Sequence, residues 1–198
     1  ETDVKPILLN GLRMAMLRCG KHELPHIDTA KVDQVLRSRL SIISQTVEEN
    51  MEMDLDEFLR LASLAVKRFG AKMVVLDPWN EVEHKRRQGE SETEYIGRAI
   101  RAIKLFAKTH DIAFWLVAHP TKPQADNRNR PPGLYDIAGS ANFANKADYG
   151  LTYHRPKFDL NEAEIIVTKV RMGLPGRRGS VKVKYDFRTS EFVELEPA

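Results

Sequence analysis

The stretch that decides the fold is Lys72-Met73-Val74-Val75-Leu76-Asp77, an apolar and β-branched run that ends on a carboxylate. Short runs that are apolar on both faces are typical of strands buried in a parallel sheet. A second such run, residues 112–118, ends at His119, and a helical pattern over residues 92–110 separates the two runs. Strands joined by helices predict an α/β domain whose sheet is mostly parallel, with helices on both faces.

Towards the N-terminus the pattern is mainly helical. Apolar residues recur at helical spacing over residues 2–20, and a shorter helix is predicted over residues 31–37. A capping box that begins at Asp54 opens a third helix, which ends at Gly70. The short apolar run at residues 40–44 predicts one more strand of the parallel sheet.

Towards the C-terminus the pattern changes to strands joined by tight turns. Residues 120–133 are rich in proline and polar side chains, which predicts an exposed loop. Short connections without helices favour antiparallel pairing of the strands that follow. These strands are residues 149–154, 164–171, 180–186 and 191–195.

Composition excludes several classes of protein. The 198 residues are 42% hydrophobic and 30% charged, which is typical of a globular domain and excludes wholesale disorder. A single cysteine, Cys19, excludes an intramolecular disulfide framework and a cysteine metal cluster. No apolar run approaches the length of a membrane span. The single cysteine fits a reducing compartment, so we expect a cytoplasmic location and no contact with membranes.

Charge is distributed unevenly. Residues 119–184 contain twelve Lys and Arg but six Asp and Glu, a net charge of +6 in a chain whose total is +3. The excess is compatible with a side that faces a polyanion, although on charge alone a solvated charged surface is the better explanation.

Polar residues that follow the two apolar strands are the first candidates for a site. Ligands of open parallel sheets bind at the carboxyl ends of strands, where Asp77 and His119 are expected. Asp77 could hold Mg²⁺ through water, or could simply cap the turn that follows it. His119 could bind a phosphate, or could be a loop residue without a ligand.

Two further segments could meet phosphates. The Gly139-Ser140 step precedes a predicted helix, whose first backbone N–H groups could bind an anion or serve only as an ordinary cap. Lys169 and Arg171 share one face of a strand end, where they could also be the cations of a protected edge strand.

The order of these features resembles the RecA-type motor domain of the DnaB/Twinkle superfamily of replicative hexameric helicases, and most of all the Twinkle-like primase-helicases of phages and bacteria. The resemblance covers nearly the whole chain and implies a RecA-like three-layer sandwich with antiparallel strands at its C-terminal end. Five motifs in the family's order carry it. They are residues 74–80, 115–122, 135–141, 145–148 and 168–171.

The resemblance implies a role for each catalytic candidate, with ATP and Mg²⁺ as cofactors. Asp77 matches the Walker B aspartate, and His119 matches the residue that senses the γ-phosphate. Arg171 matches the arginine finger that reaches the nucleotide of the neighbouring subunit, with Lys169 beside it. Glu1 stands where the family has the glutamate that orients the attacking water.

The resemblance also implies partners: single-stranded DNA and further copies of the chain in a homo-oligomer, most simply a hexamer. Whether a primase domain is fused to it is not specified by the sequence. The loop over residues 121–139 matches the DNA-binding loop of the central channel. The DNA contacts implied are Lys122, Arg128, Arg130, Gly139, Ser140 and Lys146.

The chain departs from the family in one respect, because G-x-x-x-x-G-K-[ST] occurs nowhere in it. We therefore expect residues 1–198 to be a single RecA-like helicase domain that lacks the strand–P-loop–helix unit and is inactive alone. Two alternatives stay open: a RecA-like ATPase that is a recombinase or signalling protein, and a DNA-binding or oligomerisation module without a P-loop. The direction of movement, the ring size and the roles of Arg177 and Arg178 are not specified by the sequence.

Overall fold

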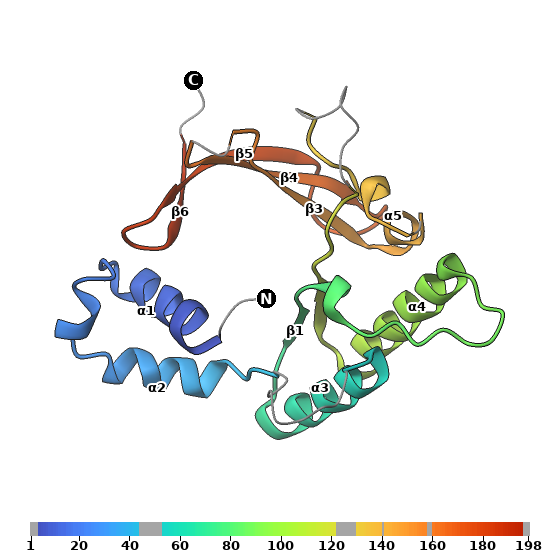
Figure 1. Cartoon of the computed structure of the whole chain (residues 1–198), viewed down its shortest axis with the longest axis horizontal. Coiled ribbons are helices and arrows are strands. Elements are labelled where there is room, and N and C mark those ends of the chain that lie inside the picture. Colours follow the sequence, from blue (N-terminus) through green and yellow to red (C-terminus); the bar gives the residue numbers. More distant parts are fainter. Residues whose placement is uncertain (1–3, 44–52, 122–129, 140, 158–159, 196–198) are drawn as a thin grey trace. The chain divides into compact units, whose positions relative to one another are not determined.

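The structure is a computed structural model that describes residues 4–43, 53–121, 130–139, 141–157 and 160–195. The chain forms two compact units (Figure 1). Unit 1 comprises Glu1–Leu40, Leu151–Val167 and Arg177–Ala198. Unit 2 comprises Ser41–Gly150 and Thr168–Gly176.

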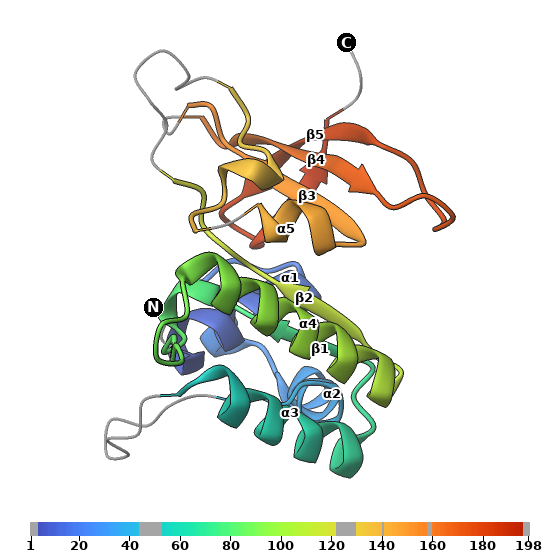
Figure 2. The same ribbon diagram turned by 90° about the vertical axis from the view of Figure 1, so that its right-hand side faces the viewer.

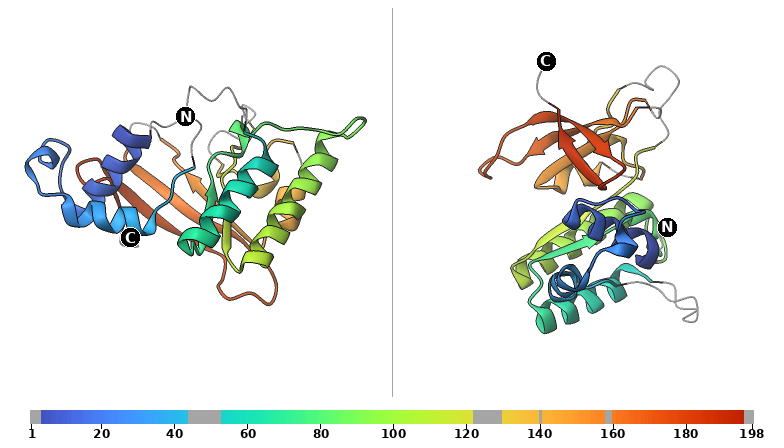
Figure 3. Two further views of the ribbon diagram at one scale, coloured as in Figure 1. Left: turned by 90° about the horizontal axis from the view of Figure 1, so that it is seen from below. Right: turned by 90° about the vertical axis from the view of Figure 1, so that its left-hand side faces the viewer.

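Unit 2 contains the parallel strands expected from the two apolar runs. β1 (Met73–Leu76) pairs in parallel with β2 (Ala113–Leu116), in a register that places Leu76 opposite Leu116. The helices α3 (Leu55–Phe69) and α4 (Glu92–His110) lie side by side and pack on this pair of strands (Figures 2 and 3). The predicted strand–helix–strand core of the domain is therefore confirmed.

The helices α3 and α4 begin and end at the residues that the sequence indicated. The Asp54 carboxylate accepts a hydrogen bond from the Glu57 amide at 2.8 Å, and Gly70 ends α3 in the left-handed conformation at φ 65°. Ser91 and Glu94 form a reciprocal capping box at the start of α4. These caps satisfy backbone groups that would otherwise lack partners at the helix ends.

The two faces of the parallel pair differ in exposure. Val74 and Leu76 are buried in a cluster that includes Phe58 and Ala62 of α3 and Ile96 of α4. The alternate positions in and beside the strands are about half exposed in this chain: Met73, Val75, Trp115 and Val117. The buried positions of β1 therefore pack against α3 and α4.

The remainder of unit 2 follows the proline-rich loop. A short 3₁₀ turn, η5 (Leu134–Asp136), leads to α5 (Asn142–Lys146), and α5 packs on α4. Beyond α5 the chain enters β3 at Tyr149 and returns to unit 2 at the end of β4.

Unit 1 begins with a helical hairpin, drawn in blue in Figure 3. A π-helical segment (Val4–Leu9) continues into α1 (Asn10–Leu17), and a turn leads to α2 (Ala30–Arg39). An ion pair of 2.7 Å between Arg13 and Asp33 joins the two α-helices. Cys19, just after α1, is buried.

The other part of unit 1 is formed mostly by a four-stranded sheet in the order β3-β4-β5-β6. Its β4–β5 and β5–β6 pairs are antiparallel, as the short connections predicted. The strands are β3 (Tyr149–His154), β4 (Glu162–Val170), β5 (Gly179–Asp186) and β6 (Glu191–Glu194).

One element of the prediction is wrong. Residues 40–43 form no strand, and Ser44 lies outside the described residues. No strand among the described residues pairs with this run, so it gains no ladder hydrogen bonds. Leu40 and Ile42 are exposed, and Ile43 alone of the three packs against the core cluster. Within the described ranges, no helix is long and apolar enough to cross a membrane.

Candidate functional site

The carboxyl ends of β1 and β2 stay side by side beyond the last paired residues. The Val117 amide donates to the Leu76 carbonyl at 3.0 Å, and the Trp79 amide donates to the Val117 carbonyl at 2.7 Å. One step further, the Asn80 side-chain oxygen accepts a hydrogen bond from the His119 amide at 3.3 Å. The segments that carry Asp77 and His119 are thereby tied to each other.

Asp77 and His119 are both exposed at this edge. Asp77 directly follows β1, in a cis peptide bond to the buried Pro78, and Trp79 after it is almost completely buried. The buried residues anchor the turn while the carboxylate remains accessible. The two predicted strand-end residues are therefore placed at one edge of the sheet, as a ligand site there requires.

The predicted DNA loop begins immediately after His119, and its base is closed. Thr121 donates to the carbonyl oxygen of Asp136 through its amide at 2.7 Å and through its hydroxyl at 3.0 Å. The Arg130 guanidinium binds both carboxylate oxygens of Asp136 at 2.9 and 2.8 Å. The Gly133 amide N–H, and then Arg130, hold the pKa of the Asp136 carboxyl below its usual range. Asp136 thus joins the two ends of the loop.

Gly139 and Lys146 dock the segment that follows the loop onto α4. The Gly139 carbonyl accepts from the Thr93 hydroxyl at 3.4 Å, and the Lys146 ammonium donates to the Gly97 carbonyl at 2.8 Å. Gly139 has φ 96°, and a Cβ atom there would lie 2.6 Å from Ile96 Cδ1. In this structure both predicted DNA contacts have a role in packing.

Lys169 and Arg171 lie against the C-terminal end of α5. Lys169 Nζ donates to the Ala144 carbonyl at 2.5 Å. Arg171 Nη2 lies 3.0 Å from the Lys146 carbonyl and 3.4 Å from the carbonyls on either side of it. Cations at this position complement the carbonyl groups that a helix leaves unpaired at its C-terminus.

A carboxylate that sequence reasoning missed completes this cluster. Asp148 Oδ1 forms an ion pair of 2.8 Å with Arg171 Nε and one of 2.7 Å with Lys104 Nζ. Lys104 comes from the middle of α4, so the pair could not be inferred from local spacing. The only signal in the sequence was that Asp148 falls within one of the five motifs of the resemblance.

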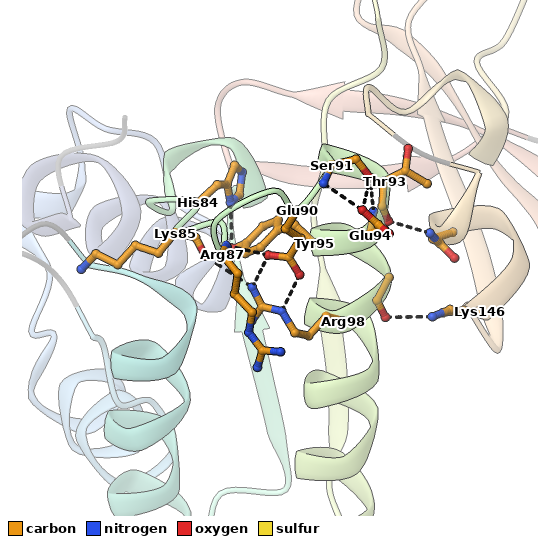
Figure 4. A network of polar contacts seen from close by, with 12 residues as sticks. His84, Lys85, Arg87, Glu90, Ser91, Thr93, Glu94, Tyr95, Arg98 and Lys146 are labelled. Atoms are coloured by element: carbon orange, nitrogen blue, oxygen red, sulfur yellow. Dashed lines mark hydrogen bonds and ion pairs between the residues drawn. The ribbon is translucent and has the colours of Figure 1, made fainter.

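A second polar network supports the loop between η3 (Trp79–Glu81) and α4 (Figure 4). Arg98 binds both carboxylate oxygens of Glu90 at 2.8 Å, and the Arg87 amide donates to Glu90 at 2.9 Å. The His84 ring lies 3.2 Å from the Tyr95 hydroxyl and stacks on Trp79 at 4.5 Å. Burial lowers the pKa of His84. This network fixes the chain that leaves the Asp77 turn.

The remaining predicted site residues fall outside the described residues. Their structural role is therefore still a prediction. They are Glu1, Lys122, Arg128 and Ser140.

Comparison with known proteins identifies the family. The family of the DnaB-like helicase C terminal domain matches residues 7–194. A Twinkle homolog protein, chloroplastic/mitochondrial, of Arabidopsis thaliana is 38% identical over 151 residues, which are 72% of this chain and 21% of that protein. The replicative DNA helicase DnaB of Leifsonia xyli is 25% identical over 167 residues, or 81% of this chain and 36% of that protein. The chain thus spans about a fifth to a third of the length of these relatives.

Solved structures have the same fold. One of them, an ATPase domain, superimposes with a TM-score of 0.67 at 17% identity, covering 95% of this chain and 70% of that one. A DnaB-like replicative helicase, from a study of its interactions with primase, gives a TM-score of 0.77 at 17% identity, covering 99% of this chain and 49% of that one. The expected RecA-like fold class is confirmed. The chain belongs to the family of DnaB-like helicase C-terminal domains, as part of a RecA-type motor domain of the DnaB/Twinkle type.

Proposed function

We propose that this chain is the core of a motor that couples ATP hydrolysis to movement along single-stranded DNA in a Twinkle-like replicative helicase. The observation that carries the proposal is the connection between His119 and the loop base. His119 is tied to the Asp77 segment through Asn80, and Thr121, two residues later, is tied to Asp136. A change at the strand ends therefore has a short covalent path to the DNA loop.

The strand ends suit a bound nucleotide. Among the residues that the structure describes, no three His, Cys, Asp or Glu side chains gather as metal ligands. Mg²⁺ keeps several waters and can be bound by one carboxylate together with phosphate oxygens, which fits the exposed Asp77. Asp77 would hold the ion through water, and the ion would neutralise phosphate charge. His119 would bind the γ-phosphate at the same edge.

Other parts of the proposed nucleotide site lie away from the ends of β1 and β2. Since G-x-x-x-x-G-K-[ST] occurs nowhere in the 198 residues, the phosphate cradle must be supplied by a segment outside this chain. Arg171 would stabilise transition-state charge on the nucleotide of the neighbouring subunit, a contribution of about 10³–10⁵ in rate. Glu1 would orient the attacking water. The chain alone should bind ATP weakly or not at all.

The motor would follow the DNA strand by contacting the phosphates of its backbone. Lys122, Arg128 and Arg130 are the cations proposed to contact phosphates, whereas Tyr135 is the one aromatic residue near the loop. Binding through phosphate contacts should depend strongly on salt concentration. Gly139, Ser140 and Lys146 are the further DNA contacts proposed. Gly139 and Lys146 are also hydrogen-bonded to α4, which gives the DNA segment a direct connection to that helix. A homohexameric ring and an attached primase domain complete the proposal.

The test uses the full-length protein that contains this chain. Arg171→Ala and Asp77→Asn should each abolish ATP hydrolysis and the unwinding of a forked duplex. If the two residues act on opposite sides of one interface, mixing the variants should restore hydrolysis, because about a quarter of the interfaces in a 1:1 mixed ring would be complete. A mixture that stays inactive would contradict the sharing of sites between subunits. Hydrolysis without unwinding would favour a RecA-like ATPase of another kind.

A further inference from the structure

The Asp148 carboxylate joins three segments of unit 2. It contacts Arg171 Nε at 2.8 Å, and its two oxygens lie 2.7 and 2.8 Å from Lys104 Nζ. The Arg171 amide also donates to the Asp148 carbonyl at 2.8 Å. Arg171 is therefore held to the same residue through its backbone and through its side chain.

These contacts use only one edge of the Arg171 guanidinium. Nε binds Asp148 and Nη2 binds the carbonyls at the end of α5, whereas Nη1 has no partner within the described residues. The Arg171 side chain is 43% exposed, so part of it is open to solvent. Because guanidinium is planar, fixing Nε and Nη2 also fixes the direction in which Nη1 donates.

Arg171 meets its carboxylate differently from Arg98. Arg98 forms a fork on Glu90, with Nε and Nη2 each 2.8 Å from a carboxylate oxygen. At Asp148, Lys104 Nζ lies 2.7 and 2.8 Å from the two oxygens, Arg171 Nε lies 2.8 Å from Oδ1, and Arg171 Nη2 donates to the carbonyls at the end of α5 instead. The second cation also leaves the three-residue cluster with a net positive charge, which keeps it attractive to phosphate.

We propose that Asp148, with Lys104 as its second counter-ion, is the positioning residue that aims the Nη1 edge of Arg171 at a phosphoryl oxygen. The inference rests on the proposed function, in which Arg171 acts on a nucleotide. An arginine side chain has many rotamers in solution, and holding it in one of them removes an entropic cost from the transition state.

Steady-state ATP hydrolysis by the full-length protein tests the inference. Asp148→Asn keeps the shape of the side chain but loses its charge, and should lower kcat by about 10- to 100-fold, as expected for a misplaced catalytic group. The KM for MgATP should stay nearly constant, because Asp148 itself does not contact the nucleotide. Asp148→Glu should restore part of the lost rate. Asp33→Asn breaks the matched 2.7 Å ion pair with Arg13 in unit 1 and should leave kcat unchanged.

A rescue experiment separates positioning from a structural effect. In Arg171→Ala, added guanidinium chloride at millimolar concentration should restore part of the hydrolysis by occupying the vacated position. In Arg171→Ala/Asp148→Asn it should restore none, because the carboxylate that holds guanidinium is gone. Without guanidinium, the double variant should be no slower than Arg171→Ala alone.

The outcomes distinguish the two proposals. Wild-type turnover in Arg171→Ala would overturn the arginine finger, and the positioning role with it. Loss of turnover in Arg171→Ala together with a normal kcat in Asp148→Asn would overturn only the role of Asp148. Equal rescue by guanidinium of Arg171→Ala and Arg171→Ala/Asp148→Asn would also overturn the role of Asp148. So would a further loss of turnover when Asp148→Asn is added to Arg171→Ala.

Discussion

Glu90 illustrates how one residue can make stability depend on pH. Hydrogen bonds from the Arg98 guanidinium, and then from the Arg87 amide, lower the pKa of Glu90 from 4.5 to about 2. A carboxyl whose pKa is lower in the folded state stabilises the protein above its unfolded pKa, and this contribution is lost as the pH falls through the folded pKa. Glu90→Gln should therefore be less stable than wild type at pH 7, and the difference should shrink between about pH 4.5 and pH 2.

Urea unfolding of both proteins at several pH values measures this difference. Glu162→Gln, which removes an exposed carboxylate from β4, is the control and should change the unfolding free energy by less than about 0.5 kcal/mol. A difference between wild type and Glu90→Gln that does not vary with pH would show that the Glu90–Arg98 pair contributes nothing through charge.

Gly139 is a second residue with a measurable role. Its φ of 96° is strained for any residue with a side chain, and a Cβ atom there would lie 2.6 Å from Ile96 Cδ1 and 2.8 Å from Glu92 Oε1. Gly139→Ala should destabilise the protein by about 1–3 kcal/mol in thermal or urea unfolding. Gly11→Ala is the opposite control: with nothing within 4 Å of a Cβ atom in its helix, it should stabilise by about 0.5–1 kcal/mol. Equal effects of the two changes would contradict the packing of Gly139 on α4.

The sequence predicted the residues of the site better than their contacts. Asp77 and His119 could be placed because the end of an apolar strand is a local signal. Asp148 and Lys104 could not, because 44 residues separate them and only the packing of α5 on α4 brings them together. Lys146 was expected as a DNA contact, and the sequence did not show that its ammonium group donates to the Gly97 carbonyl within the fold.

At the scale of elements, α4 is held at its start by a box of reciprocal hydrogen bonds. The Ser91 hydroxyl accepts from the Glu94 amide at 3.3 Å, and the Ser91 amide donates to the Glu94 carboxylate at 2.9 Å. Ser91→Ala should cost about 0.5–2 kcal/mol in urea unfolding. Ser38→Ala, at an exposed position of α2, should have little effect, since alanine has the higher helix propensity. A larger loss at Ser38 than at Ser91 would contradict the role of the cap.

The elements that were predicted well are those with their own boundary signals. α3 and α4 have caps, a glycine-rich connection separates β4 from β5, and a tight turn separates β5 from β6, so local chemistry specifies where these elements begin and end. Residues 40–43 lack such support. Their apolar side chains suit a strand, but a strand forms only where a neighbour supplies hydrogen bonds, which a single sequence does not reveal.

At the scale of the whole molecule, burial is concentrated in unit 2. The main cluster of buried side chains lies between α3, α4 and the parallel strands, whereas α2 in unit 1 has no buried residue. Amide hydrogen exchange should therefore be slowest in the middle of α4 and in β1 and β2, and much faster in α2. Protection of α2 equal to that of α4 would contradict this distribution of stability.

The unequal faces of the parallel strands also give the molecule two optical reporters. Trp79 is 4% exposed beside His84, whereas Trp115 on β2 is 44% exposed. A collisional quencher such as acrylamide should reach the Trp115 indole and leave the Trp79 emission nearly intact. Each fluorophore stands within four residues of a proposed nucleotide ligand, Trp79 after Asp77 and Trp115 before His119. Replacing either tryptophan by phenylalanine would leave one of the two native probes of this chain, with which to follow changes at the strand ends without an attached dye.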